Sequence, residues 1–304
     1  MKRILVLVGL LTLVSASNIF GQIPVIRESN RQEIMQMVGD AKISIVYHRP
    51  NVKGRTGKIY GCAAQNEIQR GNNTGACLVP NGQVWRTGAN DNTVIEFSTD
   101  VTINGQSLPA GKYAFFAIPQ DNEWTLIFNK VANEWGAFTY KADQDALRVK
   151  AAPIKLANMR ETMMFEFDSI SANTTKVVLS WESLSVPFTV NVGDINARMI
   201  GIIRNEVKNR KADDVRALNQ GAGFVFNNKM KAHYDEALGW LDESIKIKET
   251  FGNLNSKARL LAEVGKKAEA IATAEKAIQL GKAATPAANT AGLEAEVQKW
   301  KGSK

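Results

Sequence analysis

The chain has 304 residues, of which 44% are hydrophobic and 22% are charged, and its formal net charge is +8. This composition is that of a globular protein with one or two domains, and it excludes wholesale disorder, a collagen-like repeat and a multi-span membrane protein. Because the sequence holds only two cysteines and two histidines, it also excludes a disulfide-rich scaffold and leaves few ligands for a zinc site.

The chain begins with the pattern of a secretory signal peptide. Lys2 and Arg3 precede an apolar run over residues 4–14, and small and polar residues follow up to Gly21. The run is too short for a permanent membrane anchor, which needs ~20 apolar residues. We therefore expect cleavage near Gly21, export to the periplasm or the extracellular space, and no integral membrane span. A buried N-terminal helix is the alternative interpretation of the same run.

Between about Lys42 and Val192 the apolar residues tend to alternate, which is typical of strands with one buried face. The alternation is plain in residues 42–49, 123–130 and 162–169, and further short strands are predicted at 93–98, 146–151, 176–181 and 188–192. Asn104-Gly105 and residues 109–111 are turn signals. Many short strands without a helical pattern between them predict an antiparallel β-sandwich, or a barrel-like variant of it.

A polar segment interrupts this series between Cys62 and Cys77. It is rich in Gly, Asn and Gln and lacks hydrophobic periodicity, which is typical of a loop. In an oxidising compartment, two cysteines that close such a loop predict one structural disulfide, worth ~3 kcal/mol in the chain-entropy model. A reactive thiol is the alternative, but no neighbouring base or helix N-terminus that would lower its pKa is visible.

After Gly193 the periodicity becomes that of helices. Asp194 is the expected N-cap of a first helix, whose apolar face is formed by Ile195, Met199, Ile202, Ile203 and Val207. Residues 234–247 and 267–280 resemble one another at an offset of 33, close to the ~34 residues of a tetratricopeptide repeat. The sequence therefore predicts an α+β multidomain protein: a signal peptide (1–21), a β-sandwich domain (22–192) and an array of about six helices in tetratricopeptide-like hairpins (193–304).

The positive charge belongs mainly to the helical part. Residues 22–192 carry 17 basic and 16 acidic side chains, whereas residues 193–304 carry 19 and 14. In the helical part, acidic side chains such as Asp213 and Glu236 are interleaved with the basic ones, whereas a nucleic-acid surface concentrates basic side chains on one stripe. We therefore predict a solvated helical surface and no nucleic-acid partner.

Three blocks of several residues stand out in the β region: residues 47–55 (YHRPNVKGR), 84–90 (VWRTGAN) and 108–113 (LPAGKY). With residues 118–119, 124, 129–130 and 135–137 downstream, their order and spacing resemble the bacterial domain-of-unknown-function family 2911 over roughly residues 30–190. The resemblance implies an exported protein, often with helical repeats after the domain, and no established activity. His48, where a small residue is common, and the insertion between Cys62 and Cys77 depart from the family pattern.

The same blocks carry the candidate ligand-binding residues. Arginine and lysine side chains can hold an anion, an aromatic ring can stack on a sugar, and an asparagine can orient a ligand hydroxyl. We therefore predict a pocket for a small anionic or glycan ligand at one end of the sandwich, formed by Tyr47, Arg49, Lys53, Arg55, Trp85, Arg86 and Asn90. The alternative is that these side chains hold long loops in place.

Signals for catalysis are sparse. The sequence contains no nucleophile elbow, no phosphate-binding loop and no zinc-protease motif, and we predict no cofactor and no metal site. His48 is the candidate general base, with Asp91 or Glu96 as its carboxylate, while the pair Asp143 and Asp145 is interpreted as part of a turn. We predict a binding protein of the cell envelope whose helices contact a protein partner. A hydrolase that uses His48 and a purely structural assembly module are the alternatives.

Overall fold

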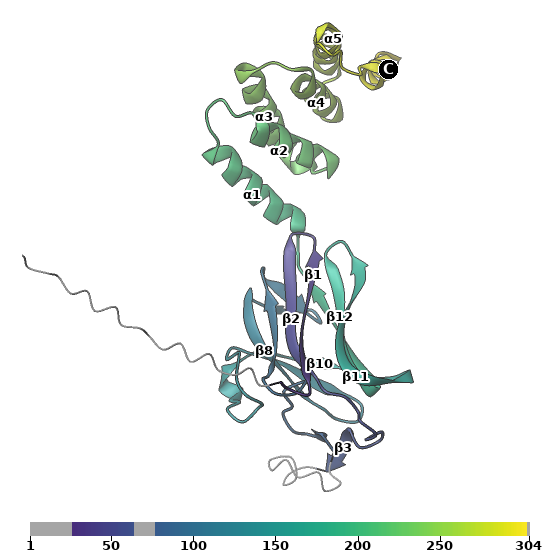
Figure 1. Cartoon of the computed structure of the whole chain (residues 1–304). Helices are drawn as coiled ribbons and strands as arrows, with labels where there is room; N and C mark the ends of the chain where they lie inside the picture. The colour runs from purple at the N-terminus through teal and green to yellow at the C-terminus, as the bar shows by residue number, and fades with distance from the viewer. Residues whose placement is uncertain (1–25, 64–76, 303–304) are drawn as a thin grey trace, which may run out of the picture.

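The computed structural model of the chain describes residues 26–63 and 77–302. Within these residues, two antiparallel sheets are followed by six α-helices, so the fold is α+β as expected (Figure 1). The expected signal peptide and most of the segment between Cys62 and Cys77 lie outside the described residues. None of the helices described is long and apolar enough to cross a membrane.

The first sheet contains six antiparallel strands in the order β1-β2-β5-β8-β9-β10. Their bounds are Asn30–Val38, Ala41–Arg49, Thr93–Phe97, Gly111–Ile118, Trp124–Asn129 and Asp145–Ala151. The sequence prediction missed β1, because apolar residues do not alternate along this edge strand. Gln32 faces the core side and accepts a hydrogen bond from the Tyr47 hydroxyl at 2.7 Å, while Met35 and Met37 are exposed on the opposite face.

The second sheet has the order β11-β12-β6-β7, with bounds Ile154–Ser171, Thr174–Asn191, Val101–Ile103 and Gln106–Leu108. The strands predicted at 176–181 and 188–192 are one strand, β12, which continues through an irregular position at Glu182 (φ +51°) instead of ending there. The predicted hairpin turn is confirmed, since Asn104 and Gly105 between β6 and β7 both have positive φ, as a type I′ turn requires. A third pair, β3 (Tyr60–Ala63) and β4 (Val79–Asn81), is parallel.

Aromatic side chains from both large sheets meet in one core. Phe115 of β8 stacks on Phe188 of β12 with ring centroids 5.5 Å apart, and Tyr47 of β2 contacts Phe165 of β11 edge-on at 4.9 Å. Such contacts join the inner faces of two packed sheets. Neither sheet closes on itself, so the barrel-like variant of the prediction is wrong.

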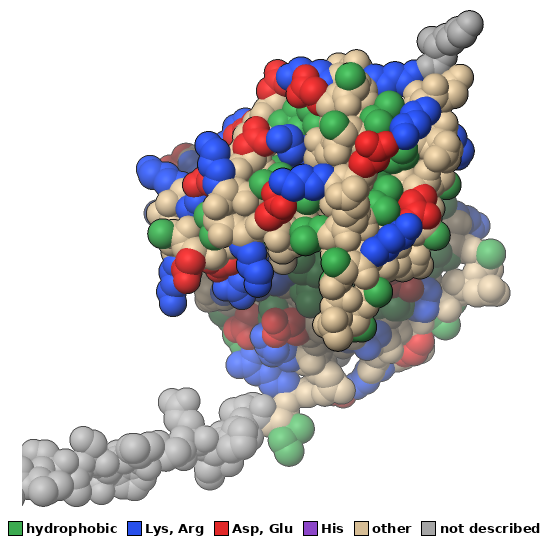
Figure 2. All heavy atoms as spheres, turned by 90° about the horizontal axis from the view of Figure 1, so that it is seen from above, with side chains coloured by type: hydrophobic (Ala, Val, Ile, Leu, Met, Phe, Trp, Pro, Cys, Tyr) green, Lys and Arg blue, Asp and Glu red, His purple; other side chains and the backbone are tan. Residues whose placement is uncertain are grey.

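The six helices are α1 (Ile195–Asn209), α2 (Arg216–Asn227), α3 (Tyr234–Ile247), α4 (Phe251–Glu263), α5 (Lys267–Ala283) and α6 (Ala291–Gly302). Residues that correspond at the offset of 33 are equally buried: Ala237 with Ala270, and Leu241 with Ala274, have no exposed surface. The internal similarity therefore marks equivalent packing positions in α3 and α5. Basic and acidic side chains are interleaved over the helical end of the molecule (Figure 2).

The first helix packs with most of its predicted face, since Ile195 packs against the β core and Ile203 and Val207 pack against the helical core. Asp194 caps α1 as predicted, because its carboxylate accepts a hydrogen bond from Ala197 N at 3.0 Å. However, Ile200 is its buried side chain, and the predicted Ile202 is 49% exposed. The apolar stripe of α1 in the helical core is formed by Ile200, Ile203 and Val207, and Ile202 lies outside it.

The helical array is attached to the β domain at the turn between β1 and β2. Arg198 of α1 forms a two-pronged ion pair with Asp40, with Nε 3.0 Å from Oδ2 and Nη2 2.5 Å from Oδ1. Gly39 has a φ of +59°, and a Cβ atom there would lie 2.2 Å from Ile195 Cδ1. The turn therefore needs glycine both for its backbone conformation and for the approach of α1.

Candidate ligand-binding site

The two aromatic candidates lie in the core. Tyr47 is 1% exposed, and its hydroxyl donates to Gln32 and accepts from Phe165 N at 3.0 Å. Burial is the main cause that raises the pKa of Tyr47. Trp85 is 7% exposed and stacks on Trp181 with ring centroids 6.1 Å apart. Neither ring presents a face on which a ligand could stack, so both act in the packing of the two sheets.

Three of the four cationic candidates hold loops. Arg49 donates from Nε to Met163 O at 2.9 Å, and Arg55 donates to two backbone carbonyls of its own loop at 2.8 and 2.9 Å. Lys53 pairs with Glu28. These contacts are the ones that the loop-holding alternative describes, and they spread the three side chains over different neighbours. The structure therefore does not bring all seven candidates into one pocket.

The remaining candidates, Arg86 and Asn90, lie on the outer face of the six-stranded sheet. Trp85 forms a bridge with Ala117 of β8 and points into the core, so Arg86, the next residue, points outward. Arg86 Nη1 donates to Asn90 O at 2.8 Å, and the Asn90 amide donates to Ser29 O at 3.3 Å. Asn90 adopts a φ of +59°, a conformation that asparagine tolerates better than most residues.

A short segment, residues 134–136, covers this region. It runs along residues 90–92: Gly136 N donates to Asn90 O at 3.1 Å, and Asn92 N donates to Glu134 O at 2.9 Å. Gly136 has a φ of +70°, and a Cβ atom there would lie 3.1 Å from Arg86 Nη1. The same Cβ atom would lie 2.8 Å from the Phe138 ring, so glycine at this position permits both the positive φ and the close packing of Phe138 and Arg86.

His48, at the end of β2, borders the same region. It is 8% exposed, and its Nδ1 lies 3.9 Å from Asp91 Oδ2, too far for a hydrogen bond. Burial is the main cause that lowers the pKa of His48, and Arg27 and Arg31 act in the same direction while Asp91 opposes them. The imidazole is therefore neutral at pH 7. Because Asp91 is paired with Arg27 at 2.9 Å, it is not free to orient His48 as a catalytic base.

The sequence reasoning missed two members of this region, Asn92 and Trp135. Asn92 is 3% exposed, and neither atom of its side-chain amide has a hydrogen-bond partner among the described residues. Trp135 bridges to Asp91 and is 50% exposed, with the Arg27 guanidinium 4.8 Å from its ring centroid. Trp135 belongs to a block that carried the family resemblance, which was the available signal, whereas nothing in the sequence singled out Asn92.

We call this region the Arg86 site and define it as His48, Arg86, Asn90, Asp91, Asn92 and Trp135. Its central group is the Arg86 side chain, which is partly buried. Burial lowers the pKa of Arg86, and Asp91 partly offsets this effect. Among the described residues, the Nε and Nη2 atoms of Arg86 have no acceptor, since the hydrogen bond to Asn90 O uses Nη1. A guanidinium group with unused donors matches the geometry of a carboxylate or phosphate.

The other predicted positions have structural partners. Asp145 accepts hydrogen bonds from the Tyr140 hydroxyl at 2.7 Å and from Arg148 at 2.6 Å, and burial together with Asp145 raises the pKa of Tyr140 to about 12. Asp143 lies in the short helix η2 (Ala142–Gln144), so the two carboxylates belong to a turn as interpreted. Cys77 is buried, but the side chain of Cys62 lies outside the described part of the structure, so their disulfide stays a prediction.

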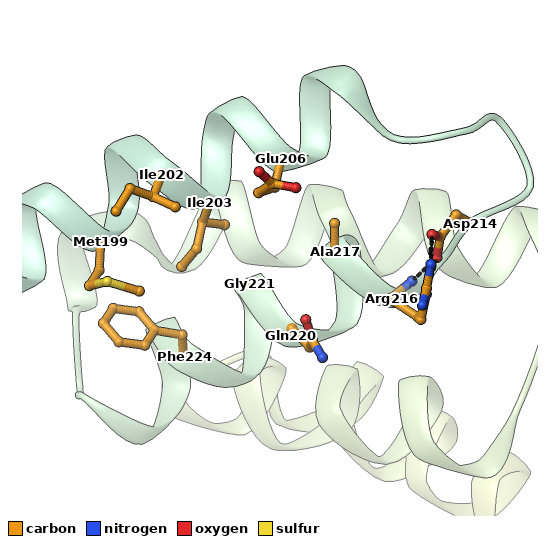
Figure 3. A pocket seen from close by; sticks show the side chains of 10 residues that line it. All are labelled: Met199, Ile202, Ile203, Glu206, Asp214, Arg216, Ala217, Gln220, Gly221 and Phe224. Atoms are coloured by element: carbon orange, nitrogen blue, oxygen red, sulfur yellow. Dashed lines mark hydrogen bonds and ion pairs between the residues drawn. The ribbon is translucent and has the colours of Figure 1, made fainter. Parts of the chain in front are cut away.

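A groove of about 420 Å³ lies between α1 and α2 (Figure 3). Met199, Ile202 and Ile203 of α1 face Phe224 and Gly221 of α2 across it. The polar lining consists of Glu206, Gln220 and the ion pair between Asp214 and Arg216. Glu206 has no ion-pair partner among the described residues.

The comparisons with known proteins concern the β region. The model of a family described as a protein of unknown function (DUF2911) matches residues 29–190, which is more than half of the chain. No curated protein and no solved structure matches the chain significantly.

Proposed function

From the premise that the chain belongs to the DUF2911 family, whose function is unknown, we propose that it is an exported binding protein of the cell envelope. Its β domain binds a small anionic or sugar ligand at the Arg86 site, and its helices contact a protein partner. Both parts act by binding and neither by catalysis.

The observation that carries the anion-binding proposal is that the partly buried guanidinium group of Arg86 has a single hydrogen-bond acceptor among the described residues. A partly buried cation is stable only when charge or hydrogen bonds compensate its lost hydration. Here the guanidinium group has one backbone carbonyl as its acceptor among the described residues, and two further arginines, Arg27 and Arg31, lie around the neighbouring His48. An anion would supply the missing acceptors.

Thermal unfolding in the presence of an anion and glycan panel tests this proposal. We expect at least one anion to raise the melting temperature of the wild-type protein, since a ligand at 100 times its Kd stabilises the folded state by ~2.7 kcal/mol. Arg86→Ala should abolish the shift. Arg160→Ala is the matched control, because Arg160 is an exposed arginine on β11 paired with Glu166 at 3.6 Å. A panel without any stabilising anion, or a shift that survives Arg86→Ala, contradicts the proposal.

In the helical part, the lining of the groove between α1 and α2 suits a peptide that carries an apolar side chain next to a basic one. Ile202 is about half exposed beside Met199 and Phe224, which suits one apolar side chain of a partner, and the unpaired Glu206 complements a neighbouring lysine or arginine. We propose that the hairpins pack as tetratricopeptide-like repeats and that this groove holds such a peptide.

Fluorescence anisotropy with a peptide library tests the groove. Peptides that combine Leu or Phe with an adjacent Lys or Arg should bind, and Ile202→Asp should weaken them at least tenfold. Ile247→Asp is the control, because Ile247 is an exposed isoleucine at the end of α3 outside the groove. Equal binding of peptides with Asp in place of Lys would contradict the charge complementarity.

Export and the disulfide complete the proposal. Residues 2–21 support secretion, so the mature protein recovered from the exported fraction should begin near Gln22 by intact-mass analysis. The pairing of Cys62 with Cys77 would stabilise the protein by ~3 kcal/mol. Reduction should therefore expose two thiols and lower the melting temperature, and an unchanged thiol count would rule the disulfide out.

A further inference from the structure

Asn92 is the most unusual polar group of the described residues near the Arg86 site. The residue is 3% exposed, and both its amide nitrogen and its amide oxygen are buried without partners there. Burying an amide without hydrogen-bond partners is destabilising, so such groups are rare in folded proteins unless they have a function. The position is not dictated by backbone strain, since Asn92 immediately precedes the regular strand β5.

The geometry brings Asn92 close to Arg86. Ile95 and Phe97 of β5 point into the core, so the alternation of the strand turns Val94 and Asn92 to the outer face, the side to which Arg86 points. Thr93 N donates to Arg86 O at 3.2 Å, which sets the two backbones side by side. The segment of residues 134–136 covers both residues. The unpaired amide and the partly buried guanidinium group therefore lie beside the same segment.

The Arg86 guanidinium group and the Asn92 amide form different hydrogen bonds, and together they specify the functional groups of a ligand. A guanidinium group only donates hydrogen bonds and pairs best with a carboxylate. An amide both donates and accepts, and a hydroxyl group is the small partner that does the same. We propose that the Arg86 site takes a hydroxylated carboxylic acid of the sugar-acid type, with its carboxylate on Arg86 and a hydroxyl on Asn92. This inference rests on the proposed function, whose ligand it specifies.

The rim of the site suits such a molecule. His48 is neutral at pH 7 because its pKa is lowered, so its ring carries one hydrogen-bond donor and one acceptor, like a hydroxyl partner. Trp135 remains 50% exposed although Arg27 lies over its ring, which leaves apolar surface for the carbon face of a sugar. Asp91 is engaged by Arg27 and does not repel the carboxylate as a free charge would.

Titration calorimetry with four probes tests the inference on the wild-type protein: galacturonate, galactose, acetate and sulfate. Galacturonate should bind about tenfold more tightly than acetate, the size of effect expected from one added hydrogen-bonded pair, and galactose should bind more weakly than galacturonate. If acetate or sulfate binds as tightly as galacturonate, the sugar-acid inference is wrong while the anion proposal stands. If no anion binds, both fail.

The variant Asn92→Leu tests whether the Asn92 amide causes the preference for galacturonate over acetate. The substitution keeps the shape and removes two unpaired polar atoms, so it should raise the melting temperature of the ligand-free protein. It should also reduce the galacturonate-to-acetate preference from about tenfold to about one, with acetate affinity retained. Thr99→Val, which removes another buried hydroxyl without a partner from beyond the far end of β5, is the matched control and should keep the preference. A preference that survives Asn92→Leu overturns the inference.

Discussion

The core of the β domain is filled mainly by large aromatic side chains, whereas many buried positions in the helical array are alanine. In the β domain the largest fully buried side chains are aromatic, including Trp124, Trp181 and Phe115. In the helices many fully buried positions are alanine, such as Ala237, Ala258 and Ala274. Two packed sheets lie ~10 Å apart and need long side chains to meet, whereas helices whose axes are ~8–10 Å apart have room only for small ones at their closest contacts. We therefore expect the stability of the β domain to be most sensitive to the removal of a large side chain, and that of the helical array to the addition of atoms at a small one.

The largest effect is expected when a large side chain is removed from the β core. Phe115 is fully buried and contacts Phe128, Phe165 and Phe188. Phe115→Ala should lower the free energy of unfolding by ~3–5 kcal/mol, because it leaves a cavity between the sheets. Chemical denaturation measures this, with Phe138→Ala, at a 70% exposed phenylalanine, as the control. Equal loss in both variants would refute the assigned core.

In the helices the sensitive change is the addition of atoms. A Cβ atom at Gly221 of α2 would lie 2.6 Å from Ile203 and 3.0 Å from Trp240, whereas one at Gly223 meets nothing within 4 Å. Gly221→Ala should destabilise the array by ~1–3 kcal/mol through overpacking. Gly223→Ala should stabilise it by ~0.5–1 kcal/mol through helix propensity. Circular dichroism at the helical minimum during denaturation measures both, and the same sign for the two would contradict the assigned packing.

The junction between the regions combines the Arg198–Asp40 ion pair with the packing of Ile195 against the β core. Arg198→Ala should cost ~1.5–3 kcal/mol, the range for hydrogen bonds to a charged group, and should loosen the array from the β domain. Arg198 lowers the pKa of Asp40 below its ordinary 3.8, so the pair stabilises the protein above that pH and is lost as the pH falls further. The difference between wild type and variant should therefore shrink in acid. Arg216→Ala, at an exposed pair, is the control.

The smallest expected effect is a change in the pH dependence of stability when His48 is replaced. Burial lowers its pKa below the ordinary 6.5, so the folded state binds fewer protons than the unfolded state. The stability from the neutral imidazole is complete above pH 6.5 and declines as the pH falls below it. His48→Gln should therefore flatten the fall in melting temperature between about pH 7 and pH 5.5. His233→Gln is the control for loss of a histidine outside the site, and equal slopes in wild type and His48→Gln would contradict a buried His48.

Much of the fold was predictable because its signals are local. Strands β2 and β9, the turn at Asn104-Gly105 and helices α3 and α5 follow from the spacing of neighbouring apolar residues. Strand β1 was not predictable in this way, because it is an edge strand whose exposed methionines break the alternation. Strand β12 appeared as two segments, because the pairing that carries it past Glu182 comes from β11 and not from its own pattern.

The candidate site was predictable only in part, because the contacts of its side chains come from segments that are distant in the sequence. Residue type alone identifies an arginine or a tryptophan as a possible ligand contact, but it does not say whether the side chain reaches a carbonyl, the core or a ligand. Tyr47 and Trp85 turned out to pack between the sheets, and Arg49 to hold a loop. Asn92 became a candidate only when its burial without partners was known.

Composition and local periodicity were therefore sufficient for the α+β class and the order of strands before helices. The sequence blocks carried the family resemblance, and the N-terminal pattern carried the expectation of export. The choice among Arg49, Arg55 and Arg86 as the proposed ligand contact required the tertiary structure, because it depends on which acceptors distant segments bring to each guanidinium group. At Arg86, the neighbouring segments provide one acceptor, Asn90 O, and leave Nε and Nη2 without a partner among the described residues. Periodicity is set by neighbours along the chain, whereas a binding site is set by neighbours in space.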